Sequence, residues 1–384
     1  MKILQVAQKP QRRGAEVFAF QLSNALRRHD HNVRIAYLYP FDDECSLPIH
    51  QEDRVLAGRE THLLEKLAGV HPGLLRSLLS VIREFRPDVV QVNGGRAVKY
   101  GAAARFADNS AAWALIYRNI GNPIDWVRGV NRLFYKNVVM PQLDGVVGVS
   151  RATLDTVKDF YGLSIPMAQI PRAVDPSSLI PSENRESVRR RVNTPSAVPV
   201  VLFIGSFTRE KRLDRFLRVF ARALARVPQA QAWLIGDGPL RPEVEQQAAR
   251  LQILSSVHFL GAQAAVADYI AAADLLMLTS DTEGIPGVIL EAGLLGLPSV
   301  ATRVGGVAEC VLDGETGLVV DPQDEAGLSD ALSALLQDAT RRKEMGAKAR
   351  DRVKKNFSLN EVMHRYVDFY REVLSLKGGE KSAA

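Results

Sequence analysis

The sequence predicts an α/β protein of two domains, each built on a parallel β-sheet with helices on both faces. Its 384 residues exceed the usual size of a single domain. Short apolar segments alternate with amphipathic helical segments in two separate series, as strands and helices do in a doubly wound sheet. Between the two series, residues 175–199 are rich in proline, serine and charge, which is typical of a linker. We therefore expect a first domain over residues 1–178, a linker over 179–198 and a second domain over 199–357.

The first series predicts the elements of the N-terminal domain. Strands are expected where several apolar residues run together, and helices where apolar residues recur every three to four positions. The predicted strands are residues 2–7, 32–39, 87–94, 112–119 and 144–150. The predicted helices are residues 16–28, 73–85, 97–107 and 125–140, and residues 41–60 form a long polar stretch.

The second series predicts the C-terminal domain in the same way. Its predicted strands are residues 198–207, 231–238, 256–261, 274–280, 298–303 and 317–321, and its predicted helices are 213–227, 241–251 and 286–296. After residue 326 the chain is expected to be mostly helical, and residues 377–384 are expected to be disordered. Two such halves place a ligand in the cleft between them, beyond the carboxyl ends of the strands.

Positive charge is unevenly distributed along the chain. The net charge is +6, and residues 1–190 carry 26 Lys and Arg against 19 Asp and Glu, so the whole excess lies there. Such asymmetry predicts an anionic partner for the first domain, either a membrane surface or a phosphorylated molecule. A solvated basic face is the alternative interpretation. Nucleic acid is not expected as a partner, because the sequence has no aromatic-rich basic patch and no known binding module.

Cysteine usage and hydropathy predict a cytoplasmic protein. Cys45 and Cys310 are the only cysteines and neither belongs to a C-x-x-C pair, which argues against a disulfide framework and fits a reducing compartment. No segment approaches the roughly 18 consecutive apolar residues of a membrane-spanning helix. The short apolar run at the N-terminus is followed by charge and predicts a strand instead of a signal peptide.

The segment from Glu283 to Glu291 is the most informative motif. Pro286 suits the first position of a helix, and Gly287 lets a ligand approach the backbone closely. The start of this helix would offer backbone N–H groups to an anion such as a diphosphate. The two carboxylates would repel that anion, but they could accept hydrogen bonds from sugar hydroxyls on either side of it. The alternative is that both are ordinary exposed residues flanking a helix.

A basic loop at FIGSFTREKRLD, residues 203–214, is a second candidate. Lys211 could neutralise a diphosphate leaving group in a dry cleft. The alternative is a solvated cluster at the start of a helix. Clustered positive charge is unfavourable at that position unless an anion offsets it, which favours the binding interpretation.

Residues 282–320, TEGIPGVILEAGLLGLPSVATRVGGVAECVLDGETGLVV, resemble the signature of the family 4 retaining glycosyltransferases of the GT-B fold. The matching features are the two Glu with seven residues between them, the Glu-Ala helix, the G-x-P turn, the following Gly-Gly and the E-x-x-x-x-G-x-x-G-L-V run. By this resemblance, Glu291 would hold the ribose hydroxyls of a nucleotide-sugar donor and Glu283 would contact the transferred sugar. Backbone N–H groups around Gly287 and Val288 would bind the diphosphate.

The resemblance extends to other loops of the donor site. Gly205 and Lys211 match the family pattern, whereas Ser206 stands where Arg is common, and Arg209 or Arg212 is expected to substitute for it. RRGAE, residues 12–16, corresponds to a glycine-rich loop in which Arg13 replaces the first Gly and Gly14 remains. The full set implied to bind the donor is Gly14, Gly205, Ser206, Arg209, Gly236, Gly261, Ile285, Gly287, Val288 and Glu291. Gly236 and Gly238 could instead be simple turn glycines.

The sequence departs from the family at the reacting sugar. Many members carry a His at the end of the strand before residue 120, but this chain has no His between His71 and His258. Arg118 or Asn119 must occupy that place, so the implied catalytic residues are Glu283, Lys211, Arg118 and Asn119. An Arg could bind an acceptor phosphate or the leaving diphosphate, and an Asn could hydrogen-bond the donor sugar. The alternative is that residues 118–123 form only a turn.

The resemblance implies transfer of a sugar from a nucleotide-diphosphate sugar to an acceptor hydroxyl with retention of configuration, in cell-surface polysaccharide, lipopolysaccharide or glycolipid synthesis. It also implies a helix over residues 358–376 that crosses back to the first domain. The acceptor would be lipid-linked, phosphorylated or a saccharide, and no cofactor or metal is expected. The D-x-E at residues 281–283 resembles a metal-binding D-x-D, which belongs to a different fold. A nucleotide-sugar-binding protein without transfer activity and a nucleotide-sugar epimerase remain as alternatives.

A basic stripe on the predicted helix 125–140 suggests peripheral binding to the inner face of the membrane. Arg128, Arg132 and Lys136 recur every four residues, with Trp126 and Phe134 nearby. This pattern suits docking on anionic lipid. A solvated face is the alternative.

Overall fold

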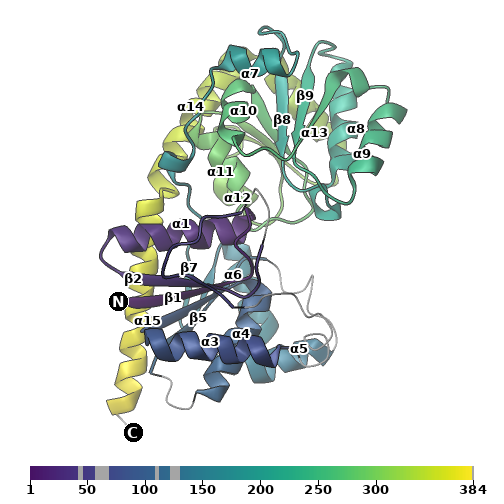
Figure 1. Ribbon diagram of the computed structural model, residues 1–384. Helices are drawn as coiled ribbons and strands as arrows, with labels where there is room; N and C mark the ends of the chain where they lie inside the picture. The colour runs from purple at the N-terminus through teal and green to yellow at the C-terminus, as the bar shows by residue number, and fades with distance from the viewer. Residues whose placement is uncertain (42–45, 57–68, 109–111, 122–129, 383–384) are drawn as a thin grey trace. The chain divides into compact units, whose positions relative to one another are not determined.

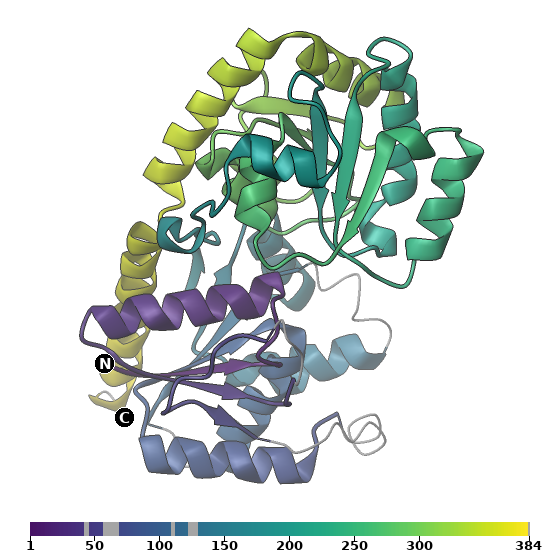
Figure 2. The same cartoon turned by 45° about the horizontal axis from the view of Figure 1, so that its top comes forward.

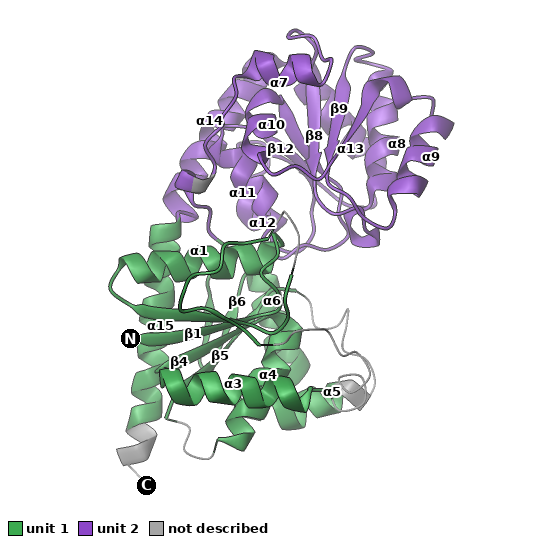
Figure 3. Ribbon diagram, viewed as in Figure 1, with its two compact units in different colours: residues 1–172, 359–384 green, residues 173–358 purple. Residues whose placement is uncertain are grey.

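The computed structural model describes residues 1–41, 46–56, 69–108, 112–121 and 130–382. The chain divides into two compact units (Figure 3): Met1–Arg172 with Leu359–Ala384, and Ala173–Ser358. The second unit thus begins at Ala173 and includes the segment that the sequence predicts as a linker. The first unit is discontinuous in sequence, because the chain returns to it after residue 358.

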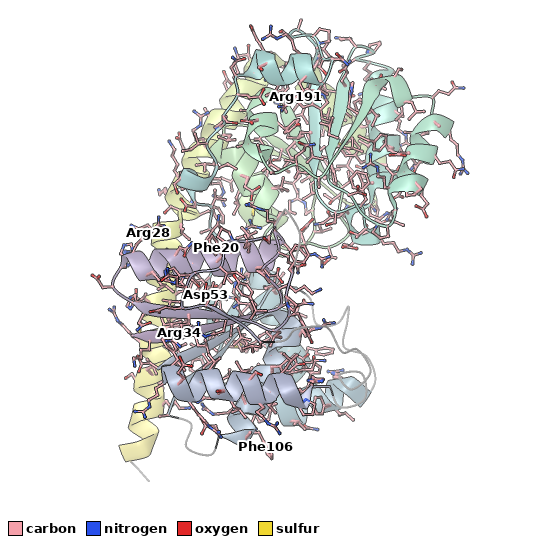
Figure 4. The ribbon with its side chains drawn as sticks, viewed as in Figure 1. Phe20, Arg28, Arg34, Asp53, Phe106 and Arg191 are labelled. Atoms are coloured by element: carbon pink, nitrogen blue, oxygen red, sulfur yellow. The ribbon has the colours of Figure 1, made fainter. Side chains whose placement is uncertain are left out.

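The first unit contains a seven-stranded parallel sheet of order β3-β2-β1-β4-β5-β6-β7. Its strands are β1 Lys2–Ala7, β2 Asn32–Tyr37, β3 Arg54–Val55, β4 Val89–Asn93, β5 Ala114–Asn119, β6 Gly145–Gly148 and β7 Met167–Gln169. All five strands predicted from the sequence are present, and β3 and β7 at the two edges were not predicted. Figure 4 labels Asp53, whose buried carboxylate accepts hydrogen bonds from the Arg27 side chain and the Ile35 amide and so fixes the start of β3.

Helices lie on both faces of this sheet (Figures 1 and 2), and alternating side chains of the strands pack toward opposite faces. Leu4 and Val6 of β1 belong to the core beneath α3 Pro72–Phe85 and α4 Gly94–Ala107. Gln5 and Ala7 face the other way, toward α1 Gly14–Arg28 and α15 Leu359–Ser382. The remaining helices are α5 Val130–Phe134 and α6 Arg151–Tyr161.

Two helix predictions in this unit need correction. The predicted helix 125–140 is irregular where it is described: α5 is followed by a π-helical turn, Tyr135–Val139, and a 3-10 turn, Met140–Gln142. The tail predicted to be disordered instead continues α15 as far as Ser382. Lys377 explains part of this extension, because its Nζ lies 2.9 Å from Oδ1 of Asp144 and anchors the helix beyond the predicted end.

The second unit contains a six-stranded parallel sheet of order β10-β9-β8-β11-β12-β13. Its strands are β8 Val200–Ile204, β9 Gln231–Ile235, β10 Val257–Gly261, β11 Leu275–Leu278, β12 Ser299–Thr302 and β13 Gly317–Val320. The strand order reverses between β8 and β11. In open parallel sheets, the crevice at the carboxyl ends of such a strand pair is where ligands bind.

Helices cover both faces of the second sheet (Figures 1 and 2). One face carries α8 Leu213–Leu224, α9 Arg241–Arg250 and α13 Glu325–Gln337; the other carries α7 Arg185–Arg191, α10 Val266–Ala272, α11 Gly287–Leu294 and α14 Ala339–Asn356. The short α12 is Val307–Cys310. The apolar face predicted for α8 is buried at Leu213, Phe216, Leu217 and Phe220. Among the described residues, no helix is long and apolar enough to cross a membrane.

Candidate functional site

Two predicted site residues meet at the carboxyl ends of β8 and β11, the reversal point of the second sheet. The Nζ of Lys211 lies 2.6 Å from Oε1 of Glu283, and the two side chains are 23% and 9% exposed. Ser280, two residues after the end of β11 and buried, donates its Oγ hydrogen to the same carboxylate oxygen at 2.6 Å. Two donors therefore orient Glu283. Sequence reasoning did not single out Ser280, although its place at the end of a predicted strand was the available signal.

The loop that carries Lys211 is tied to the end of β11 by side chain and backbone. Residues Arg209–Lys211 form a single 3-10 turn, and Arg212 follows in the left-handed conformation with φ 50°. The Oγ1 of Thr279 donates to the carbonyl oxygen of Arg212 at 3.0 Å. The amide of Asp281 donates to the carbonyl oxygen of Glu210 at 2.8 Å.

Carboxylates of the protein itself offset the positive charge of this loop. Arg212 pairs with Asp214 at 2.9 Å and with Asp281 at 3.0 Å, and Arg215 pairs with Asp281 at 2.8 Å. Burial alone would raise the pKa of Asp214, but hydrogen bonds from Arg212 and Arg218 outweigh it and lower the pKa to about 2. The basic cluster at this helix start therefore does not by itself require an external anion. The expectation from the sequence that only a bound anion would offset this charge is wrong, because Asp214 and Asp281 offset it.

The same ion pairs argue against the interpretation of residues 281–283 as a metal-binding motif. Asp281 is paired with two arginines and Glu283 with Lys211, so both carboxylates have cationic partners from the chain. In the parts of the chain that the structure describes, no three His, Cys, Asp or Glu residues are grouped so as to hold a metal ion.

The start of α11 lies immediately after Glu283. Pro286 is the N-cap residue, one position earlier in the helix than predicted, and Gly287 is the first helical residue. Proline has no side-chain acceptor with which to cap the amides of the first turn, so these N–H groups are suited to an external acceptor. Ile285 and Gly287 are buried, while Val288 and Glu291, one turn further along, are half-buried.

Three predicted glycines lie together at the carboxyl ends of β8, β9 and β10. The Gly205 amide donates to the Ile235 carbonyl at 3.0 Å, and the Gly236 amide donates to the Gly261 carbonyl at 2.8 Å. A Cβ on Gly236, whose φ is +128°, would lie 1.9 Å from the Gly205 carbonyl oxygen. Only glycine fits there, because the neighbouring atoms belong to the backbone. Ser206 and Arg209 are exposed beside this group.

The predicted catalytic residues of the first unit are buried and hydrogen-bonded within it. The side chain of Arg118, 1% exposed, stacks with its Cζ 4.2 Å from the Phe18 ring centroid and donates from Nε to the Tyr366 hydroxyl at 3.1 Å. Burial lowers the pKa of Arg118. Asn119 donates from Nδ2 to the Thr153 carbonyl at 3.1 Å. Arg118 therefore contacts the C-terminal helix, and Asn119 contacts α6.

Gly14 is exposed at the first position of α1. A Cβ at this position would lie 2.9 Å from Nη1 of Arg172, the mobile end of a long side chain, so this contact alone does not require glycine. Two residues on, Glu16 is buried and accepts a hydrogen bond from Nε2 of Gln11 at 3.3 Å. Burial raises the pKa of Glu16. Sequence reasoning identified Gly14 but assigned no role to Glu16.

The basic stripe predicted on residues 125–140 is only partly described. Arg128 and Trp126 lie outside the described residues. Arg132 places its Cζ 4.3 Å from the Phe160 ring centroid and donates to the Phe160 carbonyl. Lys136 is exposed, and so are the apolar side chains Leu133, Phe134 and Val138.

Two family models match the chain. The one described as "Glycosyltransferase Family 4" matches residues 12–178, and the one described as "Glycosyl transferases group 1" matches residues 198–338. The first match lies in the N-terminal domain predicted from the sequence, and the second begins at the last residue of the predicted linker and otherwise lies in the predicted C-terminal domain.

Curated relatives match in part. N-acetyl-alpha-D-glucosaminyl L-malate synthase of Bacillus anthracis is 34% identical over 175 residues, 46% of this chain and 46% of the relative. A GDP-mannose-dependent monoacylated alpha-(1-6)-phosphatidylinositol monomannoside mannosyltransferase of Corynebacterium glutamicum is 27% identical over 300 residues, 75% of this chain and 77% of the relative. The chain spans about half the length of several curated relatives that it matches.

A solved structure matches the fold over nearly its whole length. The structure of HepE from Anabaena, in complex with UDP and glucose, has a TM-score of 0.82 at 22% identity and covers 97% of this chain and 100% of that chain. The fold expected from the sequence, two Rossmann-like domains with a returning C-terminal helix, is thereby confirmed.

Proposed function

The chain belongs to family 4 of the glycosyltransferases and has the GT-B fold, and on this premise we propose that it transfers a sugar from a nucleotide-diphosphate sugar to an acceptor hydroxyl with retention of anomeric configuration. The observation that carries the proposal is the pair formed by Lys211 and Glu283 at the reversal point of the second sheet, beside the start of α11. Neither alternative left open by the sequence, binding without transfer or epimerisation, is favoured by any of the matches.

In the proposed reaction, Lys211 and the first amides of α11 bind the diphosphate of the donor. A fixed cation and backbone N–H groups are suited to the negative charge that develops on a leaving diphosphate. Glu283, oriented by Ser280, accepts a hydrogen bond from the transferred sugar, and Glu291 holds the ribose. The leaving diphosphate removes the proton of the acceptor hydroxyl on the face from which it departs, so configuration is retained.

We place the acceptor among lipid-linked, phosphorylated or saccharide molecules of cell-surface polysaccharide, lipopolysaccharide or glycolipid synthesis. The net charge of +6 and the relative acting on a phosphatidylinositol mannoside support an anionic acceptor. The exposed Leu133, Phe134 and Val138 beside Lys136 support docking of the first unit on an anionic membrane from the cytoplasmic side. Co-sedimentation with vesicles containing phosphatidylglycerol, but not with pure phosphatidylcholine vesicles, is the expected result, and equal binding to both would contradict it.

We propose that no metal is required, because Lys211 and the start of α11 supply the positive field that a metal supplies elsewhere. Turnover in excess EDTA should equal turnover in added Mg²⁺. A loss of turnover in EDTA that Mg²⁺ or Mn²⁺ restores would overturn this part of the proposal.

The test of the donor site is a thermal-shift panel of UDP-, GDP- and ADP-sugars on the wild type and on Glu291→Ala. A ligand at 100 times its Kd stabilises by about 2.7 kcal/mol. One nucleotide class should shift the wild type, and the shift should fall in Glu291→Ala. The control, Glu186→Ala on the exposed surface of α7, should behave as wild type. If no nucleotide shifts the wild type, the proposed donor site is wrong.

A further inference from the structure

Asp281 connects the loop of Lys211 to the end of β11 through two different arginines. It accepts from Nη1 of Arg212 in the loop and, at 2.8 Å, from Nη2 of Arg215 in the first turn of α8. Arg215 is buried and also donates from Nη1 to the Thr279 carbonyl at 2.8 Å. The Asp281 amide adds a third connection, to the Glu210 carbonyl.

These connections converge on the residues on either side of Lys211. Glu210 precedes it and accepts from the Asp281 backbone, while Arg212 follows it, pairs with the Asp281 carboxylate and has its carbonyl held by Thr279. Arg212 is also in the left-handed conformation, which a residue with a Cβ rarely adopts unless its surroundings impose it. The backbone at Lys211 is thus fixed on both sides by the segment that ends β11.

We propose that Asp281, through Arg212 and Arg215, is a positioning residue that holds Lys211 in place to bind the donor diphosphate. The inference rests on the proposed function and adds to it a residue that touches neither donor nor acceptor. It requires that Asp281 affects diphosphate binding by holding Lys211 in place, and not by the direct effect of its own negative charge on the ligand.

The negative charge of Asp281 allows a test that distinguishes a positioning residue from a bystander. A negative charge near a diphosphate site repels the ligand, so Asp281→Asn should tighten binding if Asp281 were a bystander. If Asp281 positions Lys211, the same substitution should weaken binding. The two explanations therefore predict effects of opposite sign.

The experiment is calorimetric titration of the full chain with inorganic pyrophosphate, which needs no knowledge of the nucleobase. Lys211→Ala should weaken pyrophosphate binding by about tenfold or more, as expected for loss of a charge-assisted hydrogen bond. Asp281→Asn should weaken it by about three- to tenfold. In the Lys211→Ala background, Asp281→Asn should add no weakening beyond about twofold, because residues that act through one another are not additive.

Asp330→Asn is the matched control, since Asp330 forms a surface ion pair with Arg226 in the same unit, at 2.6 Å. It should bind pyrophosphate as the wild type does. Unchanged or tighter binding in Asp281→Asn overturns the inference, and so does a full additional loss in the double variant. If Lys211→Ala weakens binding and Asp281→Asn does not, only the positioning role fails. If the wild type itself does not bind pyrophosphate, the donor site and the positioning role fail together.

Arg212 provides a second test that does not depend on the folding of Asp281→Asn. Both Arg212→Gly and Arg212→Ala remove the ion pairs, but only glycine adopts the left-handed conformation without strain. If the loop backbone is what matters, Arg212→Gly should bind pyrophosphate at least about threefold more tightly than Arg212→Ala. Equal binding by the two variants would contradict a role for the loop conformation.

Discussion

At the scale of single residues, Gly305 is in close backbone contact with Glu283 of the proposed donor site. Gly305 follows β12 with φ +48°, and a Cβ there would lie 1.7 Å from the carbonyl oxygen of Glu283. Because the neighbouring atom is backbone, it cannot rotate away as a side chain would. The turn at Gly305 therefore determines where Glu283 lies, in addition to the two donors on its carboxylate.

We predict that Gly305→Ala displaces Glu283, lowers the free energy of unfolding by about 3 kcal/mol or more, and abolishes the thermal shift with nucleotide sugar. Gly314→Ala is the matched control: Gly314 also has positive φ, +78°, but a Cβ there would meet nothing within 4 Å. It should cost about 1 kcal/mol and leave the ligand shift intact. Urea unfolding and thermal shift measure both effects, and equal costs for the two variants would refute the contact argument.

The buried carboxyl group of Glu16 should make the free energy of unfolding depend on pH. Burial raises its pKa above the ordinary value of 4.5, so the unfolded state loses this proton at lower pH than the folded state. In the window between 4.5 and the raised pKa, the folded chain binds more protons, and stability must fall as pH increases. Above the raised pKa, this contribution is constant.

In Glu16→Gln, that fall should be absent, because the amide does not titrate and still accepts the hydrogen bond from Gln11. The variant should therefore gain stability relative to the wild type as pH increases from 4.5 to 8, when both are compared by urea unfolding. Glu186→Gln, an exposed control, should follow the wild type. A constant difference between Glu16→Gln and wild type at all pH values would show that burial does not shift this group.

At the scale of elements, α7 is held to the second unit by a buried arginine. The Arg189 guanidinium, 1% exposed, pairs with Asp274 at 2.6 Å and donates to the carbonyls of Ala272 and Val198. Asp274 also accepts from Arg185 at 2.7 Å and from the Val200 amide at 2.8 Å. A single carboxylate thus joins α7 to the start of β8.

We predict that Asp274→Ala lowers the free energy of unfolding of this unit by about 3–5 kcal/mol, because it leaves the buried Arg189 charge uncompensated. Asp330→Ala is the control: both side chains of its pair with Arg226 are more than half exposed, and its loss should cost about 0–1 kcal/mol. Chemical denaturation of both variants measures the difference. A cost for Asp274→Ala no larger than the control would mean that the carbonyl partners alone satisfy Arg189.

Sequence patterns predicted the central elements well because burial produces those patterns. Every predicted strand is present in its sheet, and these strands are mostly buried except β10 and β13 at the two edges of the second sheet. The unpredicted β3 and β7 are edge strands of two and three residues, exposed or half-buried along their length, so they carry no apolar run. The tail beyond residue 376 contains two glycines and looked disordered, but the contact of Lys377 with Asp144 is tertiary and invisible to local pattern.

In the candidate site, too, residues that form a contiguous motif are predictable from the sequence, whereas contacts between distant segments are not. The motif around Glu283 and the basic loop around Lys211 were found because their residues are contiguous and resemble a family signature. The partner role of Asp281 is not predictable from local pattern, because its contact with Arg215 joins segments about 66 residues apart in sequence. Ser280 lies only three residues from Glu283, but a single serine at the end of a strand is no signature of a hydrogen bond to that carboxylate. Arg118 was expected near the reacting sugar, and its contact with Tyr366 of the C-terminal helix could not be read from either segment alone.

At the scale of the whole molecule, the C-terminal helix completes the first unit. Its apolar face is buried at Val362, Met363, Tyr366, Phe369, Tyr370 and Val373. Tyr370 donates to Gln91 of β4 at 2.6 Å, and Tyr366 accepts from Arg118 of β5. Without α15, the Oε1 of Gln91 and the Nε of Arg118 would lose these hydrogen bonds, and an unpaired buried group costs about 1–3 kcal/mol.

This arrangement predicts that residues 173–358 fold alone, whereas residues 1–172 do not. The two passages of the chain lie side by side where it leaves and re-enters the first unit, because the Val174 amide donates to the Phe357 carbonyl at 3.0 Å and Val174 bridges Ser358. A linker of about four Gly and Ser residues, which reaches roughly 13 Å, can therefore join residue 172 to residue 359.

We expect this joined chain to unfold cooperatively in urea and residues 1–172 alone to show no cooperative transition. The joined chain with Tyr366→Phe and Tyr370→Phe should unfold at a lower urea concentration, because Arg118 Nε and Gln91 Oε1 lose their hydrogen bonds to the two hydroxyls. A cooperative transition of residues 1–172 that matches the joined chain would show that α15 adds nothing to the fold of the first unit.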